Sequence, residues 1–200
     1  MKYKMDKERP LSWSSISGFH YNKEEWFKRY ILKEENPPSA EMLFGKKFAD
    51  SLEDNTCEVK ELVEKLPYKK EHKFLVMFGK VPLIGYADDF DDKKFVNLGE
   101  VKTGVKKWDQ KRADGHGQFD MYLLMNYITN KVKPEDVKCC LHWVPTTRKE
   151  TGDFEVVIDF VRPIQVVSIE TKRTMRDILA FGDYINKTLE EMESFVCRHE

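Results

Sequence analysis

Long apolar runs are absent from this chain, and no segment approaches the roughly 20 apolar residues of a membrane-spanning helix. The first seven residues are charged and have no apolar region behind them, so we expect no signal peptide and an intracellular protein. A surplus of charge of one sign is also absent, because 34 lysines and arginines face 35 aspartates and glutamates. The net charge of −1 therefore indicates no nucleic-acid partner by itself, although a local basic segment could still bind phosphate.

Cysteine patterns that hold a metal ion are missing as well. Cys57, Cys139, Cys140 and Cys197 form no C-x-x-C pair and have no zinc-type spacing. Two of them are adjacent in an expected strand, where successive side chains point to opposite faces, so both cannot easily bind one ion. We expect buried, reduced thiols.

The chain does contain enough apolar material for one large domain. Of its 200 residues, 40% are hydrophobic and 12% are aromatic, and the 34% that are charged suit a soluble protein. We find no repeat, low-complexity tract or long linker, and we therefore expect a single domain over residues 1–200. Its parts are N-terminal helices at about 12–66, a core at about 70–165 and a C-terminal helix at about 170–197.

The N-terminal part has the spacing of helices. Ser14 or Ser15 can cap a first helix, and the run Asn36-Pro37-Pro38-Ser39 ends it. The serine of that run can cap a second helix, from about Ala40 toward Leu52, and a further helical piece covers about 58–66. The apolar residues of the first helix recur at helical spacing: Ile16, Phe19, Trp26, Phe27, Tyr30 and Ile31.

From about residue 74 onward, the spacing of the apolar residues first predicts strands and then alternates between helix and strand. Two strands, Phe74–Phe78 and Val81–Phe90, are predicted around a tight turn at Gly79-Lys80, and a third runs from Phe95 to Thr103. A helix from about Gln118 to Asn130 follows. The remaining elements are strands at Val137–Thr146 and Phe154–Val161 and a long helix from Glu170 to Cys197. This order favours one α+β or α/β domain.

Two acids and a lysine stand where these strands would meet. Glu100 and Lys102 are two apart on a strand, so both project from one face. On its own this triplet is a weak signal, and an exposed pair on a solvated face explains it better. Asp88, at the end of the preceding strand, favours a site, because two carboxylates and phosphate oxygens suffice for a hard divalent cation. A tight turn at Asp92-Lys93 would place Asp88 opposite Asn97, so a looser turn or a bulge is required.

A helix and a basic segment follow the acids. Gln118 and Tyr122 are four apart and share one helix face, where they could bind a phosphate, a base edge or the neighbourhood of Lys102. Between Lys102 and Arg112 the charge pattern fits a phosphate-binding segment as well as a solvated helix start. Within it, Trp108 could stack on a base or pack at the start of a helix.

Taken in order, the motifs Gly85-x-x-Asp88, Glu100-x-Lys102-Thr103 and Gln118-x-x-x-Tyr122 resemble the PD-(D/E)xK nuclease superfamily, specifically its RecB-like exonuclease branch. The resemblance covers roughly 11–127. It implies a restriction-endonuclease-like core, in which helices flank a mixed central sheet.

The resemblance also implies roles for individual residues. Asp88, Glu100 and Lys102 would be the catalytic set. The two carboxylates would bind Mg²⁺ or Mn²⁺, with the carbonyl of Val101 as a third ligand. Further residues would contact DNA or steady the site: Gln118, Tyr122, Lys106, Lys107 and Trp108.

Two departures from the family pattern limit these expectations. Members often carry Gly-x-x-x-His on the second helix, with the histidine as a ligand, whereas here Ala49 follows Gly45 at that spacing. Some members hold an iron–sulfur cluster through four cysteines, and the scattered cysteines here predict none. A catalytically inactive relative that binds nucleic acid or a partner protein is therefore an alternative, as is an unrelated α+β protein with a fortuitous set of motifs.

The sequence thus predicts a metal-dependent DNA nuclease that hydrolyses phosphodiester bonds. We expect an exonuclease-like enzyme of DNA repair, recombination, or phage or mobile-element DNA processing. We expect it in the cytoplasm, that of the host if a phage encodes it. The motifs leave open the strandedness of the DNA, the polarity of cutting and the oligomeric state.

Overall fold

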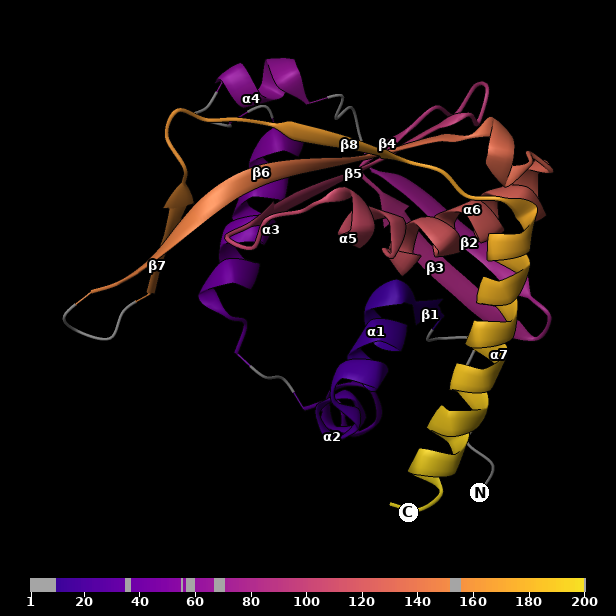
Figure 1. Cartoon of the computed structure of the whole chain (residues 1–200). Coiled ribbons are helices and arrows are strands. Elements are labelled where there is room, and N and C mark those ends of the chain that lie inside the picture. The colour runs from indigo at the N-terminus through magenta and orange to yellow at the C-terminus, as the bar shows by residue number, and fades with distance from the viewer. Residues whose placement is uncertain are drawn as a thin grey trace.

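The computed structural model describes residues 10–34, 37–54, 56, 60–66, 71–151 and 156–199. Over these residues the protein is a mixture of helices and strands with mixed sheets, as the sequence predicts at the level of class (Figure 1). No helix in the described ranges has the length and apolar character needed to cross a membrane.

The N-terminal helices differ in detail from their prediction. Helix α1 spans Trp13–Tyr21, and its cap is Ser12, whose side chain accepts a hydrogen bond from the Ser15 N–H at 3.2 Å. The predicted caps Ser14 and Ser15 are therefore wrong. The first helix is also broken, because Asn22 takes an extended backbone and its side chain caps a new helix, α2, at Lys23–Phe27.

A π-helical turn at Lys28–Leu32 follows α2. The second predicted helix is confirmed as α3, Ala40–Glu53, with Ser39 as its cap. Helix α4 covers Lys60–Lys65, so part of the predicted piece at 58–66 lies outside the described residues. The same holds for Cys57.

The first sheet contains three strands in the order β1-β3-β2, which are Leu11–Ser12, Val81–Ala87 and His72–Phe78. Strands β2 and β3 are antiparallel and joined by the predicted turn, where Gly79 has a φ of 59°. Glycine suits that left-handed position because it has no Cβ.

The second sheet has the order β4-β5-β6-β7, with β8 also paired to β6. Its strands are Asp89–Phe90, Asn97–Gly104, Lys138–Glu150, Val156–Phe160 and Val167–Thr171. Strands β5 and β6 are parallel. The connection between them carries α5, Gln110–Asp114, α6, Gly117–Asn130, and a 3-10 turn at Pro134–Asp136.

The C-terminal helix begins later than predicted. Residues 167–171 form strand β8, in which buried Ile169 and Thr171 alternate with exposed Ser168 and Glu170. Helix α7, Met175–Val196, starts only after Thr174, which forms a capping box with Asp177. The hydroxyl and carboxylate satisfy the first free N–H groups of the helix and so fix its start.

Two other strand boundaries also move. The third predicted strand begins at Asn97 and not at Phe95, because Phe95 has a φ of 61°, which no regular strand accommodates. Strand β6 continues to Glu150, beyond the predicted end at Thr146, and pairs with β7 there.

The largest core lies around α6, which buries most of its length and contacts β2, β3, α1 and α7. A second, smaller core lies under α3 and includes Phe48, Leu52 and Val144. Figure 1 shows α3 and α7 well apart, with α1 between them and β6 running toward β7 on the side away from α7. The fold thus places α6 against the strands whose ends carry the predicted acids.

The cysteines only partly match the expectation. Cys139 is buried and its neighbour Cys140 is half-buried, as expected for adjacent residues on opposite faces of β6. Cys197 is exposed just after α7, so the prediction that the thiols are buried is wrong for this residue.

Candidate functional site

The site begins where one predicted strand proves to be two. The expected strand Val81–Phe90 is interrupted at Asp88: β3 ends at Ala87 in the first sheet, and β4 begins at Asp89 in the second. At this break the Val101 N–H donates to Asp88 Oδ2 at 2.6 Å. The carboxylate therefore takes the place of a neighbouring strand for this backbone N–H.

The looser turn required by the sequence is present. Asp89 pairs with Gly99, and the Asp91 N–H donates to the Asn97 carbonyl at 3.1 Å, so the connection spans residues 92–96. This register brings Asp88 beside Glu100 and Val101. The Asp91 side chain accepts from the N–H groups of Lys93 and Lys94 in this connection, whereas Asp89 lies in β4.

Glu100 and Lys102 form an ion pair on β5 in which the carboxylate is buried and the lysine partly exposed. Glu100 is only 3% exposed, and its Oε1 lies 2.5 Å from Lys102 Nζ. The alternative of an exposed pair on a solvated strand is therefore wrong. The second carboxylate oxygen, Glu100 Oε2, is buried and has no hydrogen-bond partner among the residues that the structure describes. An unpaired buried carboxylate oxygen is costly, which makes this atom the most unusual feature of the site.

Gln118, in the first turn of α6, connects the members of the site. Its Nε2 donates to Glu100 Oε1 at 2.8 Å and to Tyr122 Oη at 2.6 Å. Its Oε1 accepts from Lys102 Nζ at 2.9 Å. One amide thus fixes the carboxylate and the ammonium relative to each other, in agreement with the expected role near Lys102.

Tyr122 is buried, with 2% exposure, and its hydroxyl donates to the Tyr86 carbonyl. The phenol is thus held inside the protein between β3 and Gln118. The same packing explains Gly85: a Cβ there would lie 2.6 Å from Tyr122 Cε1.

His116 was not predicted as a site residue, yet it joins the network. Its Nε2 lies 3.1 Å from Gln118 Oε1. Because that oxygen only accepts, Nε2 carries the proton. The ring packs edge-on against Trp13 and Trp108. Burial, and then the charge of Lys102, lower the pKa of His116 to about 4, so the imidazole is neutral at pH 7.

The two carboxyl groups repel each other in a desolvated place. Burial, and then the charge of Glu100, raise the pKa of Asp88 to about 7. Burial also raises the pKa of Glu100, against the opposing effects of Lys102 and Gln118. Two carboxylates thus share one ammonium, and a bound cation would relieve both the repulsion and the unpaired oxygen.

The carbonyl of Val101 is placed on the same side as Asp88. In a strand, the N–H and C=O of one residue point to the same neighbour, and the Val101 N–H points to Asp88. All three predicted metal ligands therefore lie at this break between the sheets. Within the described ranges, no group of three or more histidine, cysteine, aspartate or glutamate side chains is placed to hold an ion.

The basic segment proves to be the start of a helix with two exposed lysines. Asp109 caps α5, and Lys106 and Lys107 are exposed before it. Trp108 is buried, and the Arg112 guanidinium lies over its ring at 3.8 Å from the centroid. The side chain of Trp108 therefore packs at the helix start and is not free to stack on a base.

Helix α3, which carries Ala49 at the expected histidine position, packs against the other face of β5. A Cβ at Gly45 would lie 3.5 Å from Thr103 Oγ1, and Val101 packs against the core under α3. Acids from elsewhere do approach Asp88: burial first, and then Asp88, Glu53 and Asp50, raise the pKa of Glu71.

No known family model matches the chain, and no curated protein matches it either.

Proposed function

We propose that the protein is a Mg²⁺- or Mn²⁺-dependent DNA nuclease with a restriction-endonuclease-like core, related to the RecB-like exonuclease branch. The observation that carries the proposal is Glu100 Oε2, beside Asp88 and Lys102: this buried carboxylate oxygen has no hydrogen-bond partner in the described part of the chain. The motif residues meet at one place although they come from three separate elements.

The donor set fits a hard divalent cation. Asp88 and Glu100 would hold it through carboxylate oxygens, with the Val101 carbonyl beside them, and waters or phosphate oxygens would complete the shell. A bound Mg²⁺ or Mn²⁺ would supply activation of water and neutralisation of charge on the phosphate. The cation would also remove the repulsion that raises the pKa of Asp88.

The protein's own residues would orient the reactants. Lys102 can position the attacking water and stabilise negative charge near the phosphate, since its side chain is 28% exposed and is therefore accessible from outside. Gln118 holds this lysine and Glu100 in fixed relation. Neutral His116 donates to Gln118 and keeps the amide from rotating.

The exposed Lys106 and Lys107 follow β5 directly and can bind the phosphates that flank the cut. Such contacts are independent of base sequence, as an end-trimming enzyme of DNA repair, recombination or mobile-element DNA processing requires. Arg112 fixes the backbone of this segment, because its Nη1 donates to the carbonyls of both lysines. The guanidinium itself lies over the ring of Trp108.

The proposal is tested with linear and circular DNA in Mg²⁺, Mn²⁺ or EDTA. We expect metal-dependent cutting that Lys102→Ala abolishes and that Lys187→Ala, an exposed change on α7, leaves intact. Degradation of linear DNA alone would indicate an exonuclease. Intact DNA in both metals would contradict the proposal.

A second candidate is an inactive relative that binds nucleic acid or a partner protein. It is favoured by Ala49 in place of a histidine ligand. Within the described ranges, moreover, no group of three or more histidine, cysteine, aspartate or glutamate side chains could hold a metal ion. In that case the same assay would give a DNA complex that forms equally well in EDTA, without products.

A further inference from the structure

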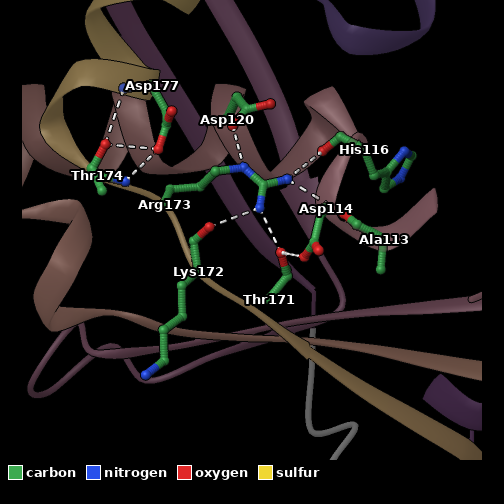
Figure 2. A network of polar contacts seen from close by, with 9 residues as sticks. All are labelled: Ala113, Asp114, His116, Asp120, Thr171, Lys172, Arg173, Thr174 and Asp177. Atoms are coloured by element: carbon green, nitrogen blue, oxygen red, sulfur yellow. Dashed lines mark hydrogen bonds and ion pairs between the residues drawn. The ribbon is translucent and has the colours of Figure 1, made fainter. Parts of the chain in front are cut away.

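Arg173, between β8 and α7, is a buried arginine that the proposed chemistry does not use. It is 5% exposed, and all five of its N–H donors have acceptors (Figure 2). A buried guanidinium satisfied in this way has one defined position.

The acceptors come from three elements of the chain. Nε donates to Asp120 Oδ1 of α6 at 2.5 Å. Nη1 donates to Thr171 Oγ1 at 2.5 Å and to the Lys172 carbonyl at 3.0 Å. Nη2 donates to the carbonyls of Ala113 at 3.3 Å and His116 at 3.5 Å.

The last two acceptors tie Arg173 to the site. Ala113 lies in α5, and His116 is the residue from which α6 begins. Figure 2 shows both carbonyls facing the guanidinium while the His116 ring points away from it. That ring donates to Gln118, which in turn holds Lys102 and Glu100.

The connection between α5 and α6 has backbone hydrogen bonds of its own: the His116 N–H donates to the Ala113 carbonyl at 3.2 Å, and the Phe119 N–H donates to the His116 carbonyl at 3.1 Å. His116 has no side-chain cap for α6. Gly117 packs under Trp13, where a Cβ would lie 2.4 Å from the ring. Contacts from outside the connection add to these local bonds: Trp13 packs against Gly117, and Arg173 donates to the carbonyls of Ala113 and His116.

We propose that Arg173 is a positioning residue of the site, which acts by holding the carbonyls of Ala113 and His116 so that His116 and Gln118 meet Lys102 and Glu100. This inference rests on the proposed function for its kinetic consequence only. The positioning itself has a spectroscopic consequence that is independent of catalysis.

Lysine at position 173 would keep the positive charge beside Asp120. It has three donors on one atom and cannot reach acceptors on opposite sides, as the planar guanidinium does. Arg173→Lys therefore frees the backbone around His116 while conserving the charge. Arg176→Lys, an exposed change one turn further on α7, is the matched control.

The test combines kinetics with the ¹⁵N spectrum of the His116 ring. In the wild type and in Arg176→Lys, we expect the Nε2–H tautomer. In Arg173→Lys we expect mixed tautomers and a fall in kcat of about 10- to 100-fold, with a much smaller change in KM. An unchanged His116 spectrum and unchanged kcat in a folded Arg173→Lys, with a lowered melting temperature only, would overturn the inference.

If Arg173→Lys does not fold, a second variant tests the same inference. Asp120→Asn keeps an oxygen acceptor for Nε but removes the buried charge that anchors the guanidinium, and the same two readouts apply with the same expected directions. If the wild type cuts no DNA, the proposed function fails, and the His116 tautomer alone then decides whether Arg173 positions the connection.

Discussion

Glu100 and Lys102 lie two residues apart on β5 and form an ion pair, with 2.5 Å between Oε1 and Nζ. The other oxygen of the buried Glu100 has no hydrogen-bond partner among the residues described. A pair that served stability alone would be expected to satisfy both oxygens. The arrangement is consistent with a carboxylate that keeps one oxygen for a cation.

The first prediction concerns the pH dependence of stability without metal. The pKa of Asp88 is raised to about 7 in the folded protein, from 3.8. The folded state therefore binds more protons than the unfolded state between these values, and stability falls as the pH rises from 4 to 7. For this group the loss is roughly 2–4 kcal/mol.

Thermal unfolding in EDTA at pH 5 and pH 8 measures this effect. His116 has the opposite trend, because its lowered pKa costs stability as the pH falls below 6.5. The contribution of Asp88 is therefore the difference between the wild type and Asp88→Asn. Mg²⁺ or Mn²⁺ at pH 8 should restore the wild type only. An equal pH dependence in both proteins would contradict the interpretation.

The second prediction concerns Gln118. Gln118→Ala removes the amide that joins Glu100, Lys102 and Tyr122. We expect a loss of about 1–3 kcal/mol in the free energy of unfolding, because a buried carboxylate loses a donor, and a lower kcat. Urea unfolding and single-turnover cutting measure the two effects, with exposed Gln165→Ala as control. Wild-type kcat in the variant would refute the positioning role.

The third prediction concerns Gly85. Gly85→Ala places a methyl group 2.6 Å from Tyr122 Cε1 and 2.8 Å from Met125 Cε, so the tyrosine must shift. We expect a loss of about 1–3 kcal/mol. Gly18→Ala is the control, because its Cβ would have no atom within 4 Å and alanine favours a helix. Equal melting temperatures for both variants would show that the packing against Tyr122 is looser than described.

The fourth prediction concerns the hydroxyl of Tyr122. Tyr122→Phe keeps the ring but leaves the Tyr86 carbonyl without its donor. We expect a loss of about 1–2 kcal/mol in the free energy of unfolding, measured by urea titration. DNA affinity in EDTA should not change, since the phenol is buried. A weaker DNA complex would instead place Tyr122 in the binding surface.

Local sequence rules predicted the elements whose causes are local. Ser39 caps α3 and Gly79 forms the β2–β3 turn as expected, because each depends on a single residue's backbone or side chain. Strand β8 was missed because the apolar alternation at 167–171 is short and directly precedes a strongly periodic helix. The break at Asn22 was missed because one polar residue interrupts a continuing apolar pattern.

The site, too, was predictable only where its causes are local. The shared faces of Glu100 with Lys102 and of Gln118 with Tyr122 follow from strand and helix periods. Three other features depend on how the two sheets diverge in space: the burial of these side chains, the hydrogen bond from Val101 to Asp88, and the contact of His116 with Gln118. The spacing of residues within one strand or helix cannot predict such an arrangement. The Gly115-His116-Gly117 run beside Gln118 was the available signal for the histidine.

The most direct test of the account is single-turnover cutting of end-labelled linear DNA by the wild type and by Lys102→Ala, in Mn²⁺ and in EDTA. The account predicts cutting by the wild type in Mn²⁺, none in EDTA, and a rate at least about 100-fold lower for the folded variant. Equal rates for the two proteins, or cutting that persists in EDTA, would contradict it.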